Sequence, residues 1–471
     1  MIPLSFAQRR IWFLDQLEGP SAAYNIAVSL RLTGELDVPA LRAALADVVE
    51  RHESLRTVIA VQDGEPSQHI LEDVRPELIR TRVTPDRLSA AMSDAAAYCF
   101  DLAAEIPLRV SLFEAGPESH VLLIVLHHIA ADGWSMAPLL RDLSAAYAAR
   151  HRATAPDFPE LPGQYADFAM WQREVLGSED DPESVIGEQL AYWRAALEGS
   201  PAELALPFDR PRPAVASHRG GTVPFSVDAE VHRALLELAR ERGVTLFMVL
   251  HAALVVLLTR LGAGEDLPVG APVAGRSDEG LDDLVGFFVN TVVLRTDVSG
   301  DPAFTELLDR VREVHLGAHA HADVPFDRLV DALGVERSAA QQALFQVMVV
   351  LQNNVRGRLE LPGLDVAVEP VELGSAKFDL TLQLSEEHGT DGGPEGLSGV
   401  LEYAVDVFDA ETARTLALRF GQVLAAVASD AAVRVDAVDI LLPGERDELA
   451  AWTDSGTVDR ARSLPELFGR W

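Results

Sequence analysis

The hydrophobic pattern of the first third of the chain predicts alternating strands and helices. Apolar residues occupy every second position over 26–32, which is the period of a strand. After Asp37, a favourable N-cap, apolar residues recur at helical spacing up to residue 49. The uninterrupted apolar run 121–126 predicts a central strand covered on both faces, and helical spacing returns over 136–147. The loop between this strand and this helix should therefore start from a buried position.

The second half repeats this mixture of periods, so the sequence predicts an α/β (α+β) fold of two lobes. Pro-rich and charged stretches near 172–185 mark the boundary, and the tail after Leu442 is broken by Gly and Pro like a linker. The helices that we expect in this half lie near 230–242, 246–260, 304–318 and 410–427, and the strands at 267–273, 287–294, 345–351, 379–384 and 397–403. We therefore expect one lobe at 1–175, a second at 176–442 and a linker at 443–471.

Acidic residues outnumber basic ones, with 73 Asp and Glu against 39 Lys and Arg and a formal net charge of −34. This charge argues against nucleic acid or an anionic membrane as the main partner, and a solvated acidic surface explains it most simply. The N-terminus lacks the pattern of a signal peptide, and the longest apolar run, 246–258, is shorter than the roughly 20 residues of a membrane span. We therefore expect a cytoplasmic protein that stays out of the membrane.

The single cysteine, Cys99, excludes a disulfide within the chain and a Cys-rich zinc site. It precedes Phe100 and has no activating basic neighbours in sequence, so we expect a small buried side chain and not a nucleophile. No cysteine or helical His-x-x-x-His stands beside the histidine pair described next, and no metal site is expected there.

Candidate acid–base chemistry lies in the loop after the predicted central strand, at His127-His128-Ile129-Ala130-Ala131-Asp132-Gly133. An unperturbed histidine pKa of ~6.5 suits proton transfer near neutral pH. Adjacent residues on an extended segment point in opposite directions, so only one histidine can face a given pocket. Asp132 can fold back to fix the loop, and Gly133 lets the chain turn or a substrate approach closely. The same residues would equally fit a structural turn with two packed histidines.

Motifs of covalent catalysis and nucleotide binding are absent from the sequence. There is no Gly-x-Ser-x-Gly elbow, no Gly-x-x-x-x-Gly-Lys-Ser/Thr phosphate loop and no Gly-x-Gly-x-x-Gly. Gly275-Arg276-Ser277 lacks the closing glycine of the elbow. A histidine base without a covalent nucleophile suits acyl transfer between two bound substrates, one of which is already activated.

Seven segments resemble, in order, the core motifs of condensation domains of non-ribosomal peptide synthetases. They are 5–14, 51–57, 127–135, 165–171, 285–291 together with Arg295, 321–327, and, as the weakest match, about 336–347. Each segment could serve packing alone, and for five of the seven we expect mainly a structural role even within the family. The order and spacing of all seven carry the resemblance.

The resemblance implies two chloramphenicol-acetyltransferase-like lobes in a V-shaped pseudodimer with a tunnel between them. Donor and acceptor peptidyl carrier proteins would bring thioesters into the tunnel on phosphopantetheine arms, and the acceptor amine would attack the donor carbonyl. No cofactor held by the chain itself is implied. The expected partners are the two carrier proteins and an adjacent adenylation domain, and the chain is expected to be a monomer.

The resemblance also assigns roles to residues. His128 resembles the active-site histidine, which takes a proton from the attacking amine or positions that amine. The supporting residues would be His127, Asp132, Arg56 and Gly133, and the tunnel-lining candidates are Trp134, Ser135 and Asn290. Among them, Asp132 would pair with Arg56 in preference to Arg51. Gly133 would flank the tunnel, where a large side chain should block the donor arm.

Other members of the same superfamily remain to be separated. The intact histidine pair differs from heterocyclisation and recruitment relatives, Gly133-Trp134-Ser135 differs from epimerisation relatives, and the opening segment resembles the subclass with an L-configured donor. A stand-alone acyltransferase using coenzyme A thioesters and a non-catalytic docking module stay open. The C-terminal linker argues against the first and the histidine pair against the second. A role in antibiotic or siderophore biosynthesis follows from the family.

Overall fold

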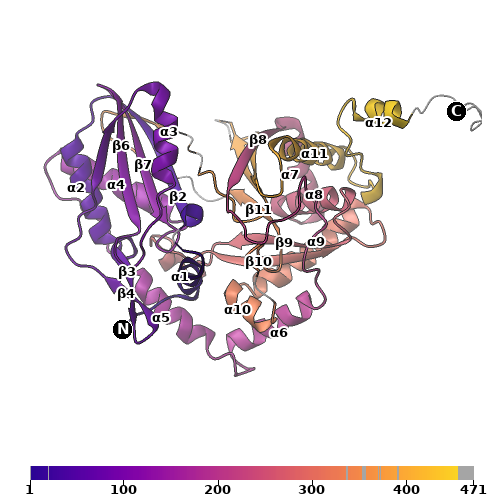
Figure 1. Ribbon diagram of the computed structural model, residues 1–471, viewed down its shortest axis with the longest axis horizontal. Coiled ribbons are helices and arrows are strands. Elements are labelled where there is room, and N and C mark those ends of the chain that lie inside the picture. The colour runs from indigo at the N-terminus through magenta and orange to yellow at the C-terminus, as the bar shows by residue number, and fades with distance from the viewer. Residues whose placement is uncertain are drawn as a thin grey trace, which may run out of the picture.

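The computed structural model describes residues 2–19, 21–335, 338–352, 357–369, 371, 373–389 and 392–453. Within these residues the chain forms two lobes side by side, each built from a mixed sheet and helices (Figure 1). The indigo and purple N-terminal half forms most of one lobe, and the pink to yellow C-terminal half forms the other (Figure 1). The α/β (α+β) fold of two lobes predicted from the sequence is confirmed.

The first lobe has a five-stranded sheet in the order β12-β2-β7-β6-β5. Its neighbouring strands are antiparallel except β5 and β6, which are parallel. The strands are β2 (Asn25–Thr33), β5 (Leu78–Arg82), β6 (Leu108–Gly116), β7 (Ser119–His127) and β12 (Asp365–Val368). The strands predicted over 26–32 and 121–126 are confirmed, and β7 lies at the centre of the sheet.

Helices cover both faces of β7, which explains its uninterrupted apolar run. On one face, α2 (Val38–Arg51) and α4 (Met136–His151) share a buried cluster with Leu122, Ile124 and Leu126. On the other face, α3 (Pro85–Ala96) shares a cluster with Val121, Leu123 and Val125. Alternate side chains of a strand point to opposite faces, so both sets anchor β7 and fix the place where the strand ends.

Smaller elements join the two lobes. A three-stranded sheet in the order β1-β4-β3 lies near α1 and α5, and α5 and α6 run along the lower edge of the molecule from one lobe to the other (Figure 1). These elements are β1 (Ile2–Pro3), β3 (Thr57–Gln62), β4 (Glu65–Ile70), α1 (Phe6–Glu18), α5 (Tyr165–Leu176) and α6 (Val185–Leu197). The connection between α5 and α6 falls inside the boundary region predicted near 172–185.

The second lobe has a six-stranded sheet in the order β10-β9-β11-β13-β14-β8. Its strands are β8 (Gly220–Asp228), β9 (Asp266–Val273), β10 (Asn290–Asp297), β11 (Val347–Gln352), β13 (Leu380–His388) and β14 (Pro394–Ala404). Its helices are α7 (Ala229–Arg242), α8 (Leu246–Arg260), α9 (Phe304–Ala320), α10 (Phe326–Ala332) and α11 (Ala410–Ser429). Short 3₁₀ turns lie at Ala22–Tyr24, Glu53–Arg56, Glu279–Leu281 and Val435–Ala437.

The structure departs from the sequence predictions in three places. The strand predicted over 287–294 begins only at Asn290, because the backbone N–H groups of Phe288 and Val289 bind a side chain of the other lobe. The stretch expected to be only a linker contains a helix, α12 (Glu445–Thr453). Cys99 is exposed, so the prediction of a buried thiol is wrong: Phe100, and not Cys99, turns into the core of the lobe.

Strand β12 links the lobes in an unexpected way. It comes from the C-terminal half of the chain, yet it extends the first sheet by pairing with β2, Val366 opposite Leu32. Next to it, Glu369 holds Arg31 through two hydrogen bonds of 2.8 Å each. The first sheet thus contains one strand from the C-terminal half of the chain.

The described residues include no single helix that is long and apolar enough to cross a membrane, and α7 and α8 reach that length only together, across a bend of 106°. Two sequence predictions touch residues outside the described ranges: the weakest motif match at 336–337 and the linker beyond residue 453.

Candidate active site

The histidine pair lies at the end of the central strand β7. His127 is the last residue of the strand and is paired with Asn25 of β2. The next backbone N–H, that of His128, donates to the carbonyl of Tyr24 over 2.8 Å, and the N–H of Ala130 donates to the His127 carbonyl over 3.0 Å. The loop therefore turns sharply away from the sheet while its first backbone groups stay bonded.

The two histidines have different surroundings, as expected for adjacent residues at the end of a strand. His127 is buried, and its Nδ1 accepts a 3.2 Å hydrogen bond from the backbone N–H of Ile129. His128 as a residue is partly exposed, and its ring lies 4.8 Å from the ring of Phe287, between centroids. Its Nδ1 has no hydrogen-bond partner among the described residues, while the backbone groups of His128 itself and of Ala131 oppose part of the fall in its pKa.

Both rings are neutral near pH 7. Burial lowers the pKa of His127 to about 3, helped by the positive charge of Lys377. Burial also lowers the pKa of His128 well below its usual value, and Lys377 and then His127 add to this effect. A neutral imidazole at a partly accessible position can accept a hydrogen bond or a proton from a bound amine.

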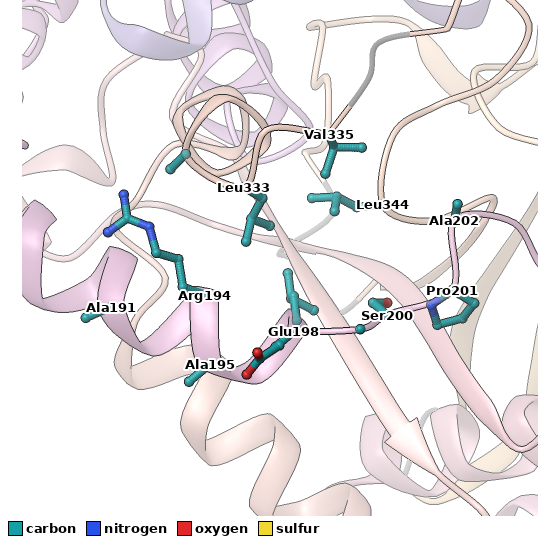
Figure 2. Close-up of a pocket in the computed structure, with 13 residues that line it drawn as sticks. Ala191, Arg194, Ala195, Glu198, Ser200, Pro201, Ala202, Leu333, Val335 and Leu344 are labelled. Carbon is teal, nitrogen blue, oxygen red and sulfur yellow. The ribbon is translucent and has the colours of Figure 1, made fainter.

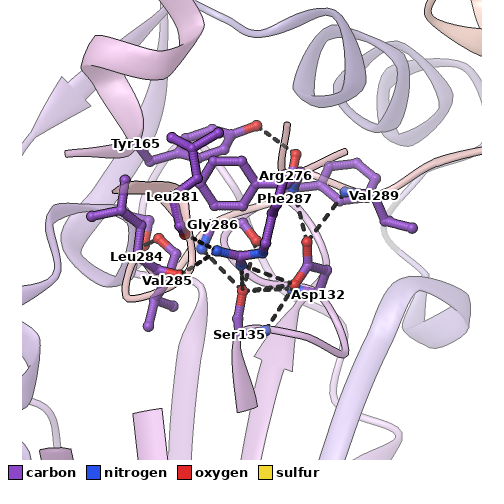
Figure 3. A network of polar contacts seen from close by, with 12 residues as sticks. Asp132, Ser135, Tyr165, Arg276, Leu281, Leu284, Val285, Gly286, Phe287 and Val289 are labelled. Carbon is purple, nitrogen blue, oxygen red and sulfur yellow. Dashed lines mark hydrogen bonds and ion pairs between the residues drawn. The ribbon is translucent and has the colours of Figure 1, made fainter. Parts of the chain in front are cut away.

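Asp132 is fully buried at the other end of the loop and ties it to the second half of the chain (Figure 3). One carboxylate oxygen accepts the N–H groups of Phe288 and Val289 at 2.9 and 3.2 Å. The other accepts the N–H and hydroxyl of Ser135 at 2.9 and 2.8 Å. Since these donors come from two segments far apart in sequence, the carboxylate fixes the loop against the strand that opens at Asn290.

The predicted pairing of Asp132 with Arg56 is wrong, because Arg276 is its cationic partner. A guanidinium nitrogen of Arg276 lies 3.4 Å from the Asp132 carboxylate and 3.1 Å from the Ser135 hydroxyl (Figure 3). The guanidinium also stacks on the Phe288 ring at 4.1 Å. Arg56 instead donates to the carbonyl of Leu71 at 2.7 Å.

The second motif segment forms a separate buried cluster. Arg51 and His52 both bind one oxygen of Asp142, in α4, at 2.7 and 2.9 Å. His52 is almost fully buried, and burial lowers its pKa despite the nearby carboxylate. This cluster fastens α2 to α4 behind the central strand, so the segment supports the lobe and does not reach His128.

Residues of the first, fourth and fifth motif segments meet behind the loop. The hydroxyl of Tyr165 donates to the Phe287 carbonyl and lies within hydrogen-bonding distance of the Ser5 hydroxyl, both at 2.7 Å. Gln8 donates from its amide to the carbonyl of Ile129 at 3.2 Å. The Ser135 hydroxyl also lies 2.9 Å from the carbonyl oxygen of Gly286, a second acceptor for its single proton. These contacts hold the backbone on both sides of His128.

The remaining candidates occupy distinct places. Gly133 is exposed and Trp134 is partly buried, as their positions in the loop allow, while Ser135 is fully buried in the Asp132 network. Asn290 donates from its amide to the carbonyls of Ala322 and Val324 at 2.8 and 2.7 Å, and so holds the sixth motif segment. Its amide nitrogen is thereby occupied by protein.

Lys377 is the residue near the histidines that the sequence analysis missed. Its ammonium lies 5.0 Å from the centroid of the Tyr24 ring, although it comes from the second lobe, just before β13. The carbonyl of the same Tyr24 binds the backbone of His128. A compositional signal was available, because Lys377 is the only lysine in the sequence.

Two further features lie away from the loop. A surface pocket of about 710 Å³ opens between the end of α6 and the loop after α10, with Arg194, Glu198 and Leu333 in its wall (Figure 2). None of its lining residues belongs to the histidine loop. Over the described residues, no group of three or more His, Cys, Asp or Glu side chains is arranged to hold a metal ion.

Comparison with known proteins identifies the family. Residues 1–450 match the family model described as the Condensation domain. The chain is 54% identical over 470 residues to a probable non-canonical nonribosomal peptide synthetase, CymA, of Salinispora arenicola, covering 100% of the chain and 6% of the relative. It is 51% identical over 470 residues to a dimodular nonribosomal peptide synthase of Bacillus subtilis, covering 99% and 20%. The chain therefore spans about a fifth or less of these relatives.

Solved structures agree. The X-domain from teicoplanin biosynthesis is 38% identical, with a TM-score of 0.88 over 93% of this chain and 98% of that one. A four-domain nonribosomal peptide synthetase, holo-AB3403, matches at 25% identity and a TM-score of 0.85, over 94% of this chain and 34% of that one. With a family model over nearly the whole chain and seven motif segments in order, this chain belongs to the condensation-domain family of nonribosomal peptide synthetases, the enzymes that form peptide bonds.

Proposed function

We propose that the chain transfers a donor aminoacyl or peptidyl group to the amine of an acceptor aminoacyl group, with both groups held as thioesters on peptidyl carrier proteins. The observation that supports this most directly is the neutral imidazole of His128, a partly exposed residue directly after β7. The acceptor nitrogen bonds to the donor carbonyl carbon, the C–S bond breaks, and the departing thiolate takes up the proton that the amine loses.

The surroundings of His128 favour one of its two conceivable roles. An α-ammonium group has a pKa of about 8, whereas burial and Lys377 hold the pKa of His128 well below its usual range. Proton transfer from the ammonium to this ring is therefore uphill. His128 instead accepts a hydrogen bond from the neutral amine and takes a proton only after attack, when the nitrogen has become far more acidic.

The finer expectations from the sequence belong to the same proposal. The carriers would bring phosphopantetheine arms through a tunnel between the lobes, and the chain itself would hold no cofactor. An adenylation domain would follow the linker at 443–471, after lobes at 1–175 and 176–442. The chain would act as a cytoplasmic monomer with an L-configured donor. The chain covers only a small share of its much longer relatives, which supports the proposal that further domains adjoin it.

The test is single-turnover transfer between a loaded donor carrier and a loaded acceptor carrier, followed by intact-protein mass spectrometry. His128→Ala should slow transfer by about 10²–10⁴-fold, the usual contribution of a positioned acid–base group. His69→Ala is the matched control, because His69 is exposed on β4, and it should transfer at the wild-type rate. Replacing the donor carrier with free acyl-coenzyme A should give no product, which separates this function from a coenzyme A-dependent acyltransferase.

A second function is favoured by one comparison. The X-domain that this chain resembles at 38% identity was also solved in a complex with OxyB from teicoplanin biosynthesis. A docking module of that kind would bind a partner enzyme and show no transfer with any loaded pair. Wild-type protein that folds, binds both carriers and yields no product across several substrate pairs would favour this second function.

A further inference from the structure

The basic residues of this chain are almost all arginine. Of the 39 lysine and arginine positions, only Lys377 is lysine. Arginine carries a planar fork that suits paired contacts, whereas lysine presents a compact ammonium whose proton affinity responds to burial. Because arginine fills every other basic position, the lysine at 377 points to a need for an ammonium group there.

Lys377, from the second lobe, contacts Tyr24, the residue that precedes β2 of the first lobe by one position. Its ammonium sits over the ring of Tyr24, at 5.0 Å from the centroid, in a cation–π contact across the lobes. Tyr24 in turn lies 6.5 Å from His127, between ring centroids, and binds the backbone N–H of His128 through its carbonyl. Tyr24 therefore contacts both Lys377, through its ring, and the backbone of the active-site loop, through its carbonyl.

The charges around Lys377 come from both lobes. Burial lowers the pKa of Lys377 to about 8, opposed by Glu402 of β14 and assisted by Arg10 of α1. Burial raises the pKa of Glu402, and Lys377 opposes that rise. With a pKa of about 8, Lys377 is mostly protonated at pH 7, and its positive charge contributes to the lowered pKa of both His127 and His128.

We propose that Lys377 is a positioning residue of the condensation reaction: its ammonium group keeps both His128 and the incoming acceptor amine in their neutral forms. This inference rests on the proposed function, since it assumes an amine at His128. A neutral amine is the nucleophile, and a neutral imidazole is its hydrogen-bond acceptor. A nearby positive charge favours both neutral forms by the same repulsion.

The experiment is the pH profile of single-turnover transfer between pH 6 and 9. With Lys377→Met, the acidic limb of the profile should move up by about one pH unit, so that transfer slows about tenfold at pH 7 and recovers near pH 9. Lys377→Arg keeps the charge and should return the limb toward its wild-type position. Arg414→Met removes one exposed charge from α11, where it pairs with Glu411, and should leave the profile unchanged.

A second variant guards against misfolding. Lys377→Met alone leaves the Glu402 carboxylate buried without its cation, so the double variant Lys377→Met/Glu402→Gln removes both charges. The double variant should show the same displaced acidic limb. A rate that falls equally at every pH would overturn the inference and assign Lys377 to the lobe contact with Tyr24, and an unchanged profile would overturn it as well.

Failure of the proposed function can be told apart from failure of this inference. Wild-type protein without any transfer refutes the proposed function. In that case NMR titration of labelled histidine still decides whether Lys377 keeps His128 neutral, the part of the inference that needs no transfer. The pKa of His128 should rise in the Lys377→Met variant and return toward the wild-type value in the Lys377→Arg variant, and equal pKa values in all three proteins would overturn it.

Discussion

Replacing Asp132 by asparagine should destabilise the protein by about 3–5 kcal/mol, the usual cost of breaking a buried, hydrogen-bonded ion pair. The carboxylate accepts from five groups, and its two oxygens face donors on both sides. An asparagine must place its NH₂ against one of these sets. It would then face either the N–H groups of Phe288 and Val289 or the donors of Ser135 and Arg276, so that buried donors lose their acceptor.

The assay is urea unfolding followed by tryptophan fluorescence, combined with double-mutant cycles. Asp132→Asn and Arg276→Met should couple by about 1–3 kcal/mol, because the two side chains share one network. Asp132→Asn and Arg56→Met should be additive within about 0.5 kcal/mol, because Arg56 binds Leu71 and Glu53 instead. The same pairs of variants can be followed by transfer activity.

The opposite pattern would refute this reasoning. Strong coupling with Arg56 and none with Arg276 would mean that the carboxylate is held as the sequence resemblance implied, and not as the structure has it. Asp132→Asn with a cost below about 1 kcal/mol would show that water enters the site and satisfies the donors.

Three further predictions concern single residues. Burial lowers the pKa of His315 to about 3, so between about pH 6 and 3 only the unfolded chain protonates this ring. The contribution of His315 to stability should therefore fall as the pH drops from 7 to 5, by up to about 1.4 kcal/mol per unit. In urea unfolding, His315→Gln should reduce the total slope by that contribution, while the buried His127 and His128 keep theirs. Gly286→Ala would place a Cβ 2.1 Å from Tyr165 and should cost about 1–3 kcal/mol by the same assay, whereas an unchanged midpoint would mean that the ring moves freely. Tyr165→Phe removes the hydroxyl between Ser5 and Phe287 and should cost about 1–2 kcal/mol, a loss that calorimetry can check.

Local periodicity predicted most of the helices and strands, because it depends on neighbouring residues alone. Helix α8 was placed at its observed bounds, 246–260, since its apolar run has a clear N-cap and a charged end. The start of β10 was misplaced because Phe288 and Val289 are apolar and strand-like, yet their N–H groups bind Asp132. Strand β12 could not be assigned to the first sheet, because pairing between distant segments leaves no local period.

The sequence predicted the histidine pair of the site, but not the residues that hold Asp132. The histidine pair stands in one short segment, so its chemistry can be read from adjacent residues. The partner of Asp132 is 144 residues away, in Gly275-Arg276-Ser277, a segment that the sequence analysis considered only as an incomplete nucleophile elbow. Nothing in the sequence distinguishes this arginine from the others. Lys377 differs, because its residue type is unique in the chain.

The contacts around the loop explain why motif residues spread over the whole chain serve one histidine. The Nδ1 atom of His128 has no hydrogen-bond partner among the described residues, so the position of the ring depends on its backbone and on the ring of Phe287. That backbone is fixed by Tyr24 on one side and by Asp132 on the other, while Gln8 holds the loop between them. A substitution that breaks one of these contacts should therefore slow transfer by moving the imidazole of His128. The reacting groups themselves would stay the same.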